Sequence, residues 1–237
     1  MAESESIAGL LDSFRAAAGA PRLIWYGPNH ERVELSGRVL ENWVAKTSNL
    51  LTEELDAGAG SVVAVEMPPH WKTLVWALAS WQVGAVTLLD GGAPADIRAT
   101  MEPPADGSEP DHPGELLVLV APGALDMRWP GAVPSDAVDY AATVRSFGDV
   151  YLEAPADAGA ELLRASGTSA TFSDLTAGGI GSAEGIWLVP ATLPLHTVLT
   201  AAVRIWASGG TVVLVHSSVE VTDRLVEGER ITARLAA

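Results

Sequence analysis

The sequence contains no cysteine, and its only lysines are Lys46 and Lys72. Without cysteine the chain cannot form a disulfide, provide a thiol nucleophile or build a cysteine-ligated metal site. The formal net charge is −16 and the arginines are scattered, whereas nucleic acids and anionic membranes are bound by clustered lysine or arginine. We therefore expect neither nucleic acid nor a membrane as a partner, and we predict no metal site.

The N-terminal segment MAESESIAGLL is acidic and lacks the basic head of a secretory signal peptide. A mostly apolar stretch over residues 73–89 falls short of the roughly 20 residues that a bilayer requires, and it includes Gln82 and Gly84. These features favour a cytoplasmic protein over a membrane-spanning one. With 237 residues the chain is long enough to bury a substantial core.

A strand, a helix and a second strand are predicted over residues 61–92. Val62–Met67 is a β-branched run of strand length, and two prolines stop it. Trp71–Val83 has the length of a helix that Gly84 can end, and Ala85–Leu89 follows as the second strand. Two strands joined by one helix form a right-handed βαβ unit with parallel strands.

The same succession returns over residues 185–215. Ile186–Val189 and Thr211–Val215 have strand composition, and Leu195–Ala207 between them has the length and apolar content of a helix. Two such units predict an α/β fold with a mainly parallel sheet flanked by helices. We expect residues 1–237 to form a single domain of this class.

The helix predicted after the first strand is apolar nearly all round. A helix of this composition is buried on more than one side, so we expect Trp76 and Trp81 to lie in the core. His70 precedes this helix, and we expect it to cap the helix or to form a core hydrogen bond rather than to bind a ligand. Lys72 in its first turn, like Lys46 on the polar face of another helix, is predicted to be solvated or snorkelling.

The N-terminal part of the chain contains further helix and hairpin signals. Apolar residues from Ile7 onward recur at helical spacing, with Ser4 or Ser6 available as the N-cap. Two short apolar runs around Gly-Pro-Asn-His predict a hairpin over Leu23–Leu35 at a sheet edge.

Ser36 is predicted to cap a longer helix. In that helix the spacing puts Val39 on the apolar stripe, whereas Glu41 faces water.

The middle of the chain is harder to assign. Leu116–Val120 has strand composition, and Asp136–Arg145 is predicted to be helical. Met101–Glu115 is acidic and rich in proline, so we expect a surface loop. Residues 154–185 are small and polar and receive no assignment.

Two stretches occur in an order and spacing that resemble a known family. The first, Glu34 to Asp90, contains ELSGRVLENWVAKTSNLL and GAGSVVAVEMPPHWKTLVWALASWQVGAVTLLD, and the second, Gly185 to Val215, contains VPATLPLHTVLTAAVRIWASGGTVVLV. They are similar to the N-terminal region of AMP-binding, adenylate-forming enzymes such as acyl-CoA synthetases. The resemblance implies the α/β fold of these enzymes, and it makes ATP and AMP the nucleotides to test, although we expect no tightly held cofactor.

The resemblance is incomplete at the phosphate loop. Such enzymes hold the ATP phosphates with a Ser/Thr/Gly-rich loop that ends in Pro-Lys-Gly, and the matching stretch here is Ala165–Ser173. Ser166-Gly167-Thr168 fits, but Ala170 and Ser173 stand where a glycine and the lysine are expected. One interpretation is a surviving phosphate loop. The one we favour is a capping box, Thr171 to Asp174, that starts a short helix.

Family members are also much longer than this chain. The resemblance therefore implies that their adenine-binding motif, magnesium-binding acid, ribose-binding aspartate and C-terminal lid with its catalytic lysine are missing here. We predict no catalytic residue in the chain.

The candidate ligand-binding residues come from a predicted strand end, a predicted helix start and the loop that resembles the family phosphate loop. Asp90 and Gly91 follow a strand directly, at the edge where an open α/β sheet binds ligands. His196 matches, one residue short, the family histidine that lines the acyl or aryl pocket, and its alternative role is a structural one at a helix start. Together with Ser166, Gly167 and Thr168 these residues form the predicted site.

Two hypotheses about function follow. In the first, the chain is a non-catalytic relative of the adenylate-forming region that binds a partner protein, another copy of itself or a small ligand. In the second, it is a reduced acyl-CoA synthetase-like enzyme that binds nucleotide or carboxylate and completes its site with a second chain.

Overall fold

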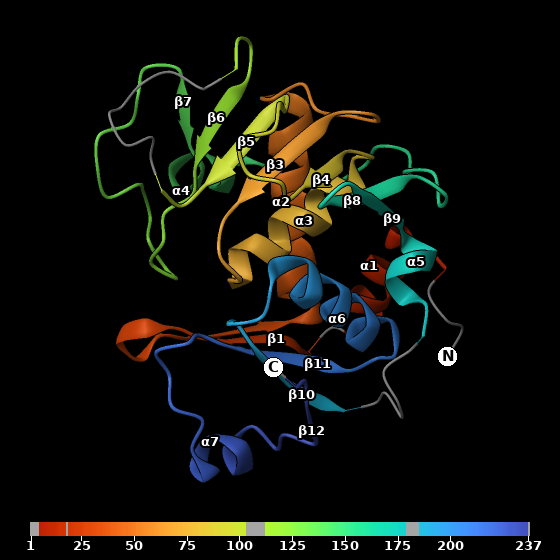
Figure 1. Ribbon diagram of the computed structural model, residues 1–237, viewed down its shortest axis with the longest axis vertical. Coiled ribbons are helices and arrows are strands. Elements are labelled where there is room, and N and C mark those ends of the chain that lie inside the picture. Colours follow the sequence, from red (N-terminus) through yellow and green to blue (C-terminus); the bar gives the residue numbers. More distant parts are fainter. Residues whose placement is uncertain (1–4, 18, 103–111, 179–184, 237) are drawn as a thin grey trace.

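The structure is a computed structural model that describes residues 5–17, 19–102, 112–178 and 185–236. In this part of the chain the strands form two sheets, and Figure 1 shows helices between them. The larger sheet has seven strands in the order β7-β6-β5-β3-β4-β8-β9, and the smaller has five in the order β12-β10-β11-β1-β2.

The strands are β1 (Pro21–Tyr26), β2 (Arg32–Ser36), β3 (Val62–Glu66), β4 (Val86–Leu88), β5 (Ile97–Thr100), β6 (Leu116–Leu119), β7 (Ala137–Asp139), β8 (Glu161–Ala165), β9 (Thr168–Thr171), β10 (Ile186–Pro190), β11 (Thr211–Val215) and β12 (Ala233–Arg234). The helices are α1 (Ile7–Ala16), α2 (Gly37–Glu53), α3 (Trp71–Gln82), α4 (Tyr140–Thr143), α5 (Phe172–Thr176), α6 (Leu195–Ala207) and α7 (Asp223–Gly228), with short 3-10 turns at Pro28–His30 and Val144–Ser146. No described helix is both long enough and apolar enough to cross a bilayer.

Both predicted βαβ units are confirmed, one in each sheet. β3 pairs in parallel with β4 through α3, and β10 pairs in parallel with β11 through α6. The α/β class with mainly parallel pairing is therefore correct, since among the described residues only the β1–β2 and β8–β9 pairs are antiparallel. The strands are divided between two sheets, however, where the sequence pattern suggested one.

Helix α3 lies between the two sheets (Figure 1). It contacts β3 and β4 of the larger sheet and β1 of the smaller one. Trp76 and Trp81 are fully buried, as predicted. Gly84 ends the helix with a φ of 82°, a conformation that glycine adopts without strain.

The local signals in the N-terminal part are largely confirmed. β1 and β2 form the predicted hairpin, and β2 is an edge strand. Ser6 and Ser36 each accept a backbone N–H at the start of a helix, as N-caps do. Ser4 lies outside the described residues.

Several expectations are wrong. Val39 is 41% exposed rather than on the buried stripe of α2, and Glu41 is buried because it receives the guanidinium of Arg15 at 2.6 Å. Asp136–Arg145 is not one helix, because Ala137–Asp139 pairs with β6 as strand β7 before the chain turns into α4.

The predicted surface loop and the predicted exposure of Lys72 also need correction. Most of Met101–Glu115 lies outside the described residues, but Met101 and Glu115 at its two ends are buried. Lys72 is only 3% exposed, since its ammonium group donates to two backbone carbonyls instead of reaching water.

Candidate functional site

Asp90 and the loop predicted to bind phosphate lie next to each other. Asp90 follows β4, and its Oδ1 accepts a hydrogen bond of 2.6 Å from the backbone N–H of Ser166. β4 and β8 are neighbours in the larger sheet, so their carboxyl ends bring the two segments together. The structure thus places Asp90 beside the turn that contains Ser166, Gly167 and Thr168.

Ser166 and Gly167 form a tight two-residue turn between β8 and β9. Their φ angles are 51° and 73°, the left-handed values of a hairpin turn that favours glycine in its second position. Thr168 closes the turn, because its hydroxyl donates to the carbonyl of Ala165 at 2.7 Å. This hairpin was not predicted, because its short, polar strands lack the β-branched alternation that identifies a strand.

The alternative interpretation of the same stretch is confirmed. Thr171 and Asp174 form a reciprocal capping box at the start of α5. The backbone and hydroxyl of Thr171 hold the pKa of the Asp174 carboxyl below its usual value. The polar side chains here therefore serve to begin a helix.

Gly91 and His196 are exposed. Gly91 follows Asp90 on a loop that is tied to β3, since the N–H of the next residue, Gly92, donates to Glu66 Oε1 at 3.0 Å. His196 lies in the first turn of α6, where its ring contacts the Thr197 hydroxyl at 3.1 Å. Within the described residues no hydrogen bond links His196 to Asp90 or to the hairpin turn.

A buried ion cluster lies beneath the loop that carries Gly91. The guanidinium of Arg98 contacts the carboxylates of Glu66 and Glu115, and its Nη2 donates to the carbonyl of Ala93 at 2.9 Å. The hydrogen bond to Glu115 is the main reason why the pKa of Arg98 lies above its ordinary value. Because each charge has a partner, this cluster holds three segments together rather than offering a free binding group.

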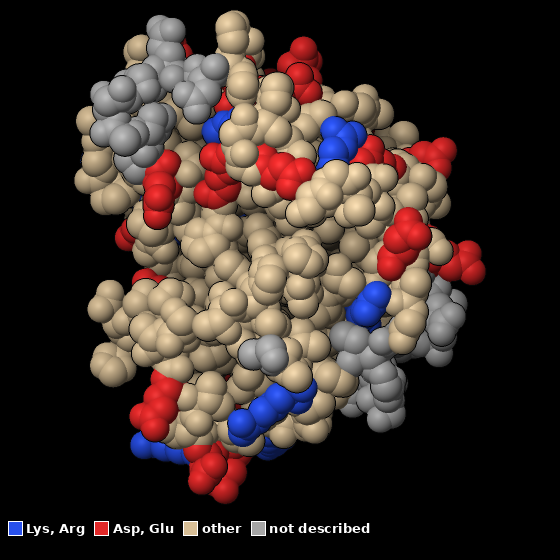
Figure 2. All heavy atoms as spheres, in the orientation of Figure 1, with Lys and Arg blue, Asp and Glu red and all other residues tan. Residues whose placement is uncertain are grey.

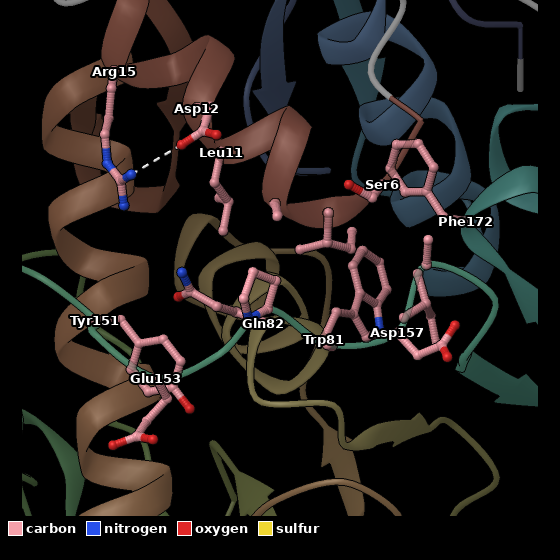
Figure 3. A pocket seen from close by; sticks show the side chains of 16 residues that line it. Ser6, Leu11, Asp12, Arg15, Trp81, Gln82, Tyr151, Glu153, Asp157 and Phe172 are labelled. Atoms are coloured by element: carbon pink, nitrogen blue, oxygen red, sulfur yellow. Dashed lines mark hydrogen bonds and ion pairs between the residues drawn. The ribbon is translucent and has the colours of Figure 1, made fainter.

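A second candidate site, which was not predicted from the sequence, is a cavity beside the N-terminal helix α1. It has a volume of about 140 Å³ and lies between α1, the end of α3 and the segment 151–158 (Figure 3). Apolar side chains from α1, α3, β8 and α5 form much of the wall, namely Ile7, Leu11, Trp81, Leu162 and Phe172. None of the six predicted site residues lines it.

Charged side chains surround this cavity. Asp12, Arg15, Glu153 and Asp157 contribute to its lining, and Figure 3 shows the ion pair of 2.9 Å between Arg15 and Asp12. Arg15 is also paired with Glu41, which raises the pKa of its guanidinium. The cavity can therefore accept a small, mainly apolar molecule, but its cation is already neutralised.

Acidic side chains are spread over the face of the molecule in Figure 2. The basic side chains on this face lie in separate places and form no continuous patch. This distribution follows the net charge of −16 of the sequence.

Comparison with known proteins identifies the family. A TIGR03089 family protein of Mycobacterium tuberculosis (strain ATCC 25618 / H37Rv) is 32% identical over 230 residues, and the match covers 92% of this chain and 92% of that protein. This chain belongs to the TIGR03089 family. The two TIGR03089 proteins are of similar length, since the match covers the same share of each. A scan against models of protein families finds no match.

Solved structures reveal the fold of this TIGR03089 protein. An acyl-CoA synthetase from Brucella canis matches with a TM-score of 0.69 and 15% identity over 95% of this chain and 46% of the synthetase. The N-terminal domain of FACL13 from Mycobacterium tuberculosis matches with a TM-score of 0.66 and 15% identity over 97% of this chain and 62% of that chain. The fold is thus that of the N-terminal region of adenylate-forming enzymes, and the chain spans about half the length of the Brucella synthetase.

Proposed function

We propose that this chain is a ligand-binding or partner-binding relative of the adenylate-forming N-terminal region, and that on its own it does not activate carboxylic acids with ATP. The observation that carries the proposal is the two-residue turn at Ser166-Gly167. A loop that cradles phosphates needs several backbone N–H groups directed at the ligand. This turn is too short to present them.

Two donors of the turn are also already used. The N–H of Ser166 donates to Asp90, and the hydroxyl of Thr168 donates to Ala165. A phosphate that approached the turn would meet the carboxylate of Asp90, which repels it. Adenylation develops negative charge on the phosphates, and enzymes stabilise that charge with fixed N–H donors, lysine or arginine and Mg²⁺.

The two lysines are engaged elsewhere. Lys46 pairs with Asp149 at 2.6 Å and donates to the carbonyl of Phe147. Lys72 donates to the carbonyls of Ala121 and Gly123. No described contact links either lysine to the hairpin turn, so the turn lacks the lysine of the family loop.

Carboxylate-dependent exchange of labelled pyrophosphate into ATP tests this proposal. The purified chain is assayed with fatty, aryl and amino acids, beside a full-length acyl-CoA synthetase as the positive control. We expect exchange at background level with every acid. Exchange above background that disappears in Thr168→Ala would show that the turn still binds phosphate, and the proposal would fail.

Thermal unfolding in the presence of ATP, AMP and acyl-adenylate mimics distinguishes a chain that binds a small ligand from one that binds a partner protein. A ligand present at 100 times its Kd adds about 2.7 kcal/mol to the free energy of unfolding. The cavity lined by Trp81 and Phe172 has room for a small apolar ligand, so a short-chain alcohol or acid is added to the set of ligands tested. If no ligand raises the unfolding temperature, the result favours a chain that binds a partner protein.

A reduced enzyme that completes its site with a second chain is the other candidate. It is favoured by one observation, that the chain spans only 46% of the Brucella synthetase. Repeating the exchange assay with the products of neighbouring genes added distinguishes the two candidates. Exchange that requires both chains supports the second one.

A further inference from the structure

A smaller cavity, of about 70 Å³, lies at the carboxyl ends of three parallel strands of the larger sheet. Trp71 and Lys72 reach it from the segment after β3, Asp126 from the segment after β6, and Tyr140 and Arg145 from the segment after β7. Open α/β sheets bind ligands beyond the carboxyl ends of their strands. This cavity shares no residue with the predicted site or with the larger cavity.

Lys72 lies at this cavity without a carboxylate partner. Its side chain is almost entirely buried, and its Nζ donates to the carbonyl oxygens of Ala121 and Gly123, each at 2.7 Å. Two of its three N–H groups are used in this way, and the positive charge remains. Within the described residues, no carboxylate lies within ion-pair distance of this ammonium group.

Two further residues with N–H donors line the same cavity. Trp71 is 2% exposed and lines the cavity, yet its indole Nε1 has no hydrogen-bond partner in the described part of the chain. Arg145 is exposed and also lines the cavity; its Nη1 donates to the sulfur of Met127, but among the described residues it forms no ion pair. In a chain with 30 acidic and 14 basic residues, two cations that line one small cavity without an ion pair among the described residues are unexpected.

The carboxylates nearby are committed to the backbone. Asp126 also lines the cavity, but its Oδ2 accepts the N–H of Gly123 at 3.0 Å. Glu31, whose charge also acts on Lys72, accepts the N–H of Ala124 at 3.0 Å. These bonds fix the segment that surrounds Lys72. One N–H of Lys72, the indole N–H of Trp71 and the remaining N–H groups of Arg145 are left for an acceptor from outside.

We propose that this cavity binds a small oxyanion of about the size of acetate, held by Lys72, Arg145 and the indole N–H of Trp71. The size follows from the volume: a cavity of roughly 150 Å³ accommodates benzene, so 70 Å³ holds about three or four non-hydrogen atoms. The aromatic walls supplied by Trp43 and Trp71, whose ring centroids are 5.4 Å apart, exclude water and strengthen each charge-assisted hydrogen bond.

The test uses the full chain, labelled with ¹⁵N at its indole nitrogens and titrated with sodium acetate against sodium chloride at equal ionic strength. We expect one indole N–H resonance to move downfield with saturation, and Trp71→Phe assigns it. Arg145→Gln should weaken acetate binding about tenfold. Arg128→Gln, an exposed arginine outside the cavity, should change it less than twofold.

Inorganic phosphate, titrated separately, distinguishes a general oxyanion site from one limited to carboxylates, and saturation with either anion supports the proposal. A response that chloride reproduces, benzoate binding as tightly as acetate, or an unchanged affinity in Arg145→Gln would each overturn it. Arg145 is exposed, so its variant is expected to fold even if Lys72→Met does not.

Discussion

The imidazole ring of His70 packs against the indole of Trp25, with ring centroids 4.6 Å apart and ring planes at 64°. His70 caps α3, because its Nδ1 accepts the backbone N–H of Lys72 at 3.1 Å. The proton of the neutral ring is then on Nε2, a buried atom without a partner among the described residues. The cap requires the neutral form of the ring, because a protonated Nδ1 cannot accept a hydrogen bond.

The first prediction is therefore a loss of stability in acid. Burial, with the charges of Lys72 and His216, lowers the pKa of His70 from 6.5 to about 3. The unfolded chain binds this proton below pH 6.5, so the contribution of His70 to stability falls as the pH decreases from about 6.5 to about 3. Over this full pH range the free energy of unfolding should fall by at most about 5 kcal/mol because of His70.

Urea unfolding between pH 4 and 7 measures this effect, with His70→Asn as the test variant and His196→Asn as the control. Asparagine keeps an N-cap acceptor but does not titrate. The difference in unfolding free energy between wild type and His70→Asn should shrink as the pH falls. A difference that stays constant over this range would contradict the assignment of a neutral, buried ring.

The second prediction concerns alkaline pH and Lys72. Burial lowers the pKa of this amine from 10.5 to about 8, although Asp126 and Glu31 favour the charged form and Arg145 opposes it. Between about pH 8 and 10.5 the unfolded chain binds the proton more strongly, so the lysine's contribution to stability rises with pH. Lys72→Met should lack this rise, which amounts to at most about 3 kcal/mol. Parallel pH profiles for the two proteins would show that the ammonium group is hydrated.

The third prediction follows from the core position of Trp76. Its ring is fully buried and lies 5.2 Å from that of Tyr140, measured between centroids. Trp76→Ala should lower the free energy of unfolding by about 3–5 kcal/mol, because a large cavity replaces the indole. Chemical denaturation measures the loss. A change below about 1 kcal/mol would mean that the ring is not part of the core.

The fourth prediction concerns the hydrogen bond between Asp90 and Ser166. Asp90→Ala removes the acceptor of the Ser166 N–H and should cost about 1–2 kcal/mol of stability. Amide hydrogen exchange at Ser166 and Gly167 should become faster, while the amides of α3 keep their relative protection. If the exchange at Ser166 is unchanged, the carboxylate does not hold the turn and is available for another role.

The sequence by itself determined the elements whose signals are local. The β-branched run of β3, the apolar run of α3 and the φ of 82° at Gly84 form one unit because each depends on neighbouring residues only. The caps at Ser36 and Thr171 were predictable for the same reason, since a cap bonds to an N–H three residues away. The order of two such stretches also pointed to the adenylate-forming fold.

Only the tertiary structure decided what distant segments do to each other. The strand β5 carries Arg98, a residue that disfavours a buried strand until Glu66 and Glu115 pair with it from two other segments. Lys72 is buried because the carbonyls of Ala121 and Gly123 accept its protons, and a sequence pattern contains no sign of such a contact.

The candidate site divides in the same way. Asp90 was foreseeable from a strand end and Ser166-Gly167 from the family resemblance. The length of the turn was not, because it depends on the antiparallel pairing of β8 with β9. Neither of the two cavities was predicted from the sequence. Each is lined by side chains from at least three segments far apart in the chain, and their convergence is a property of packing.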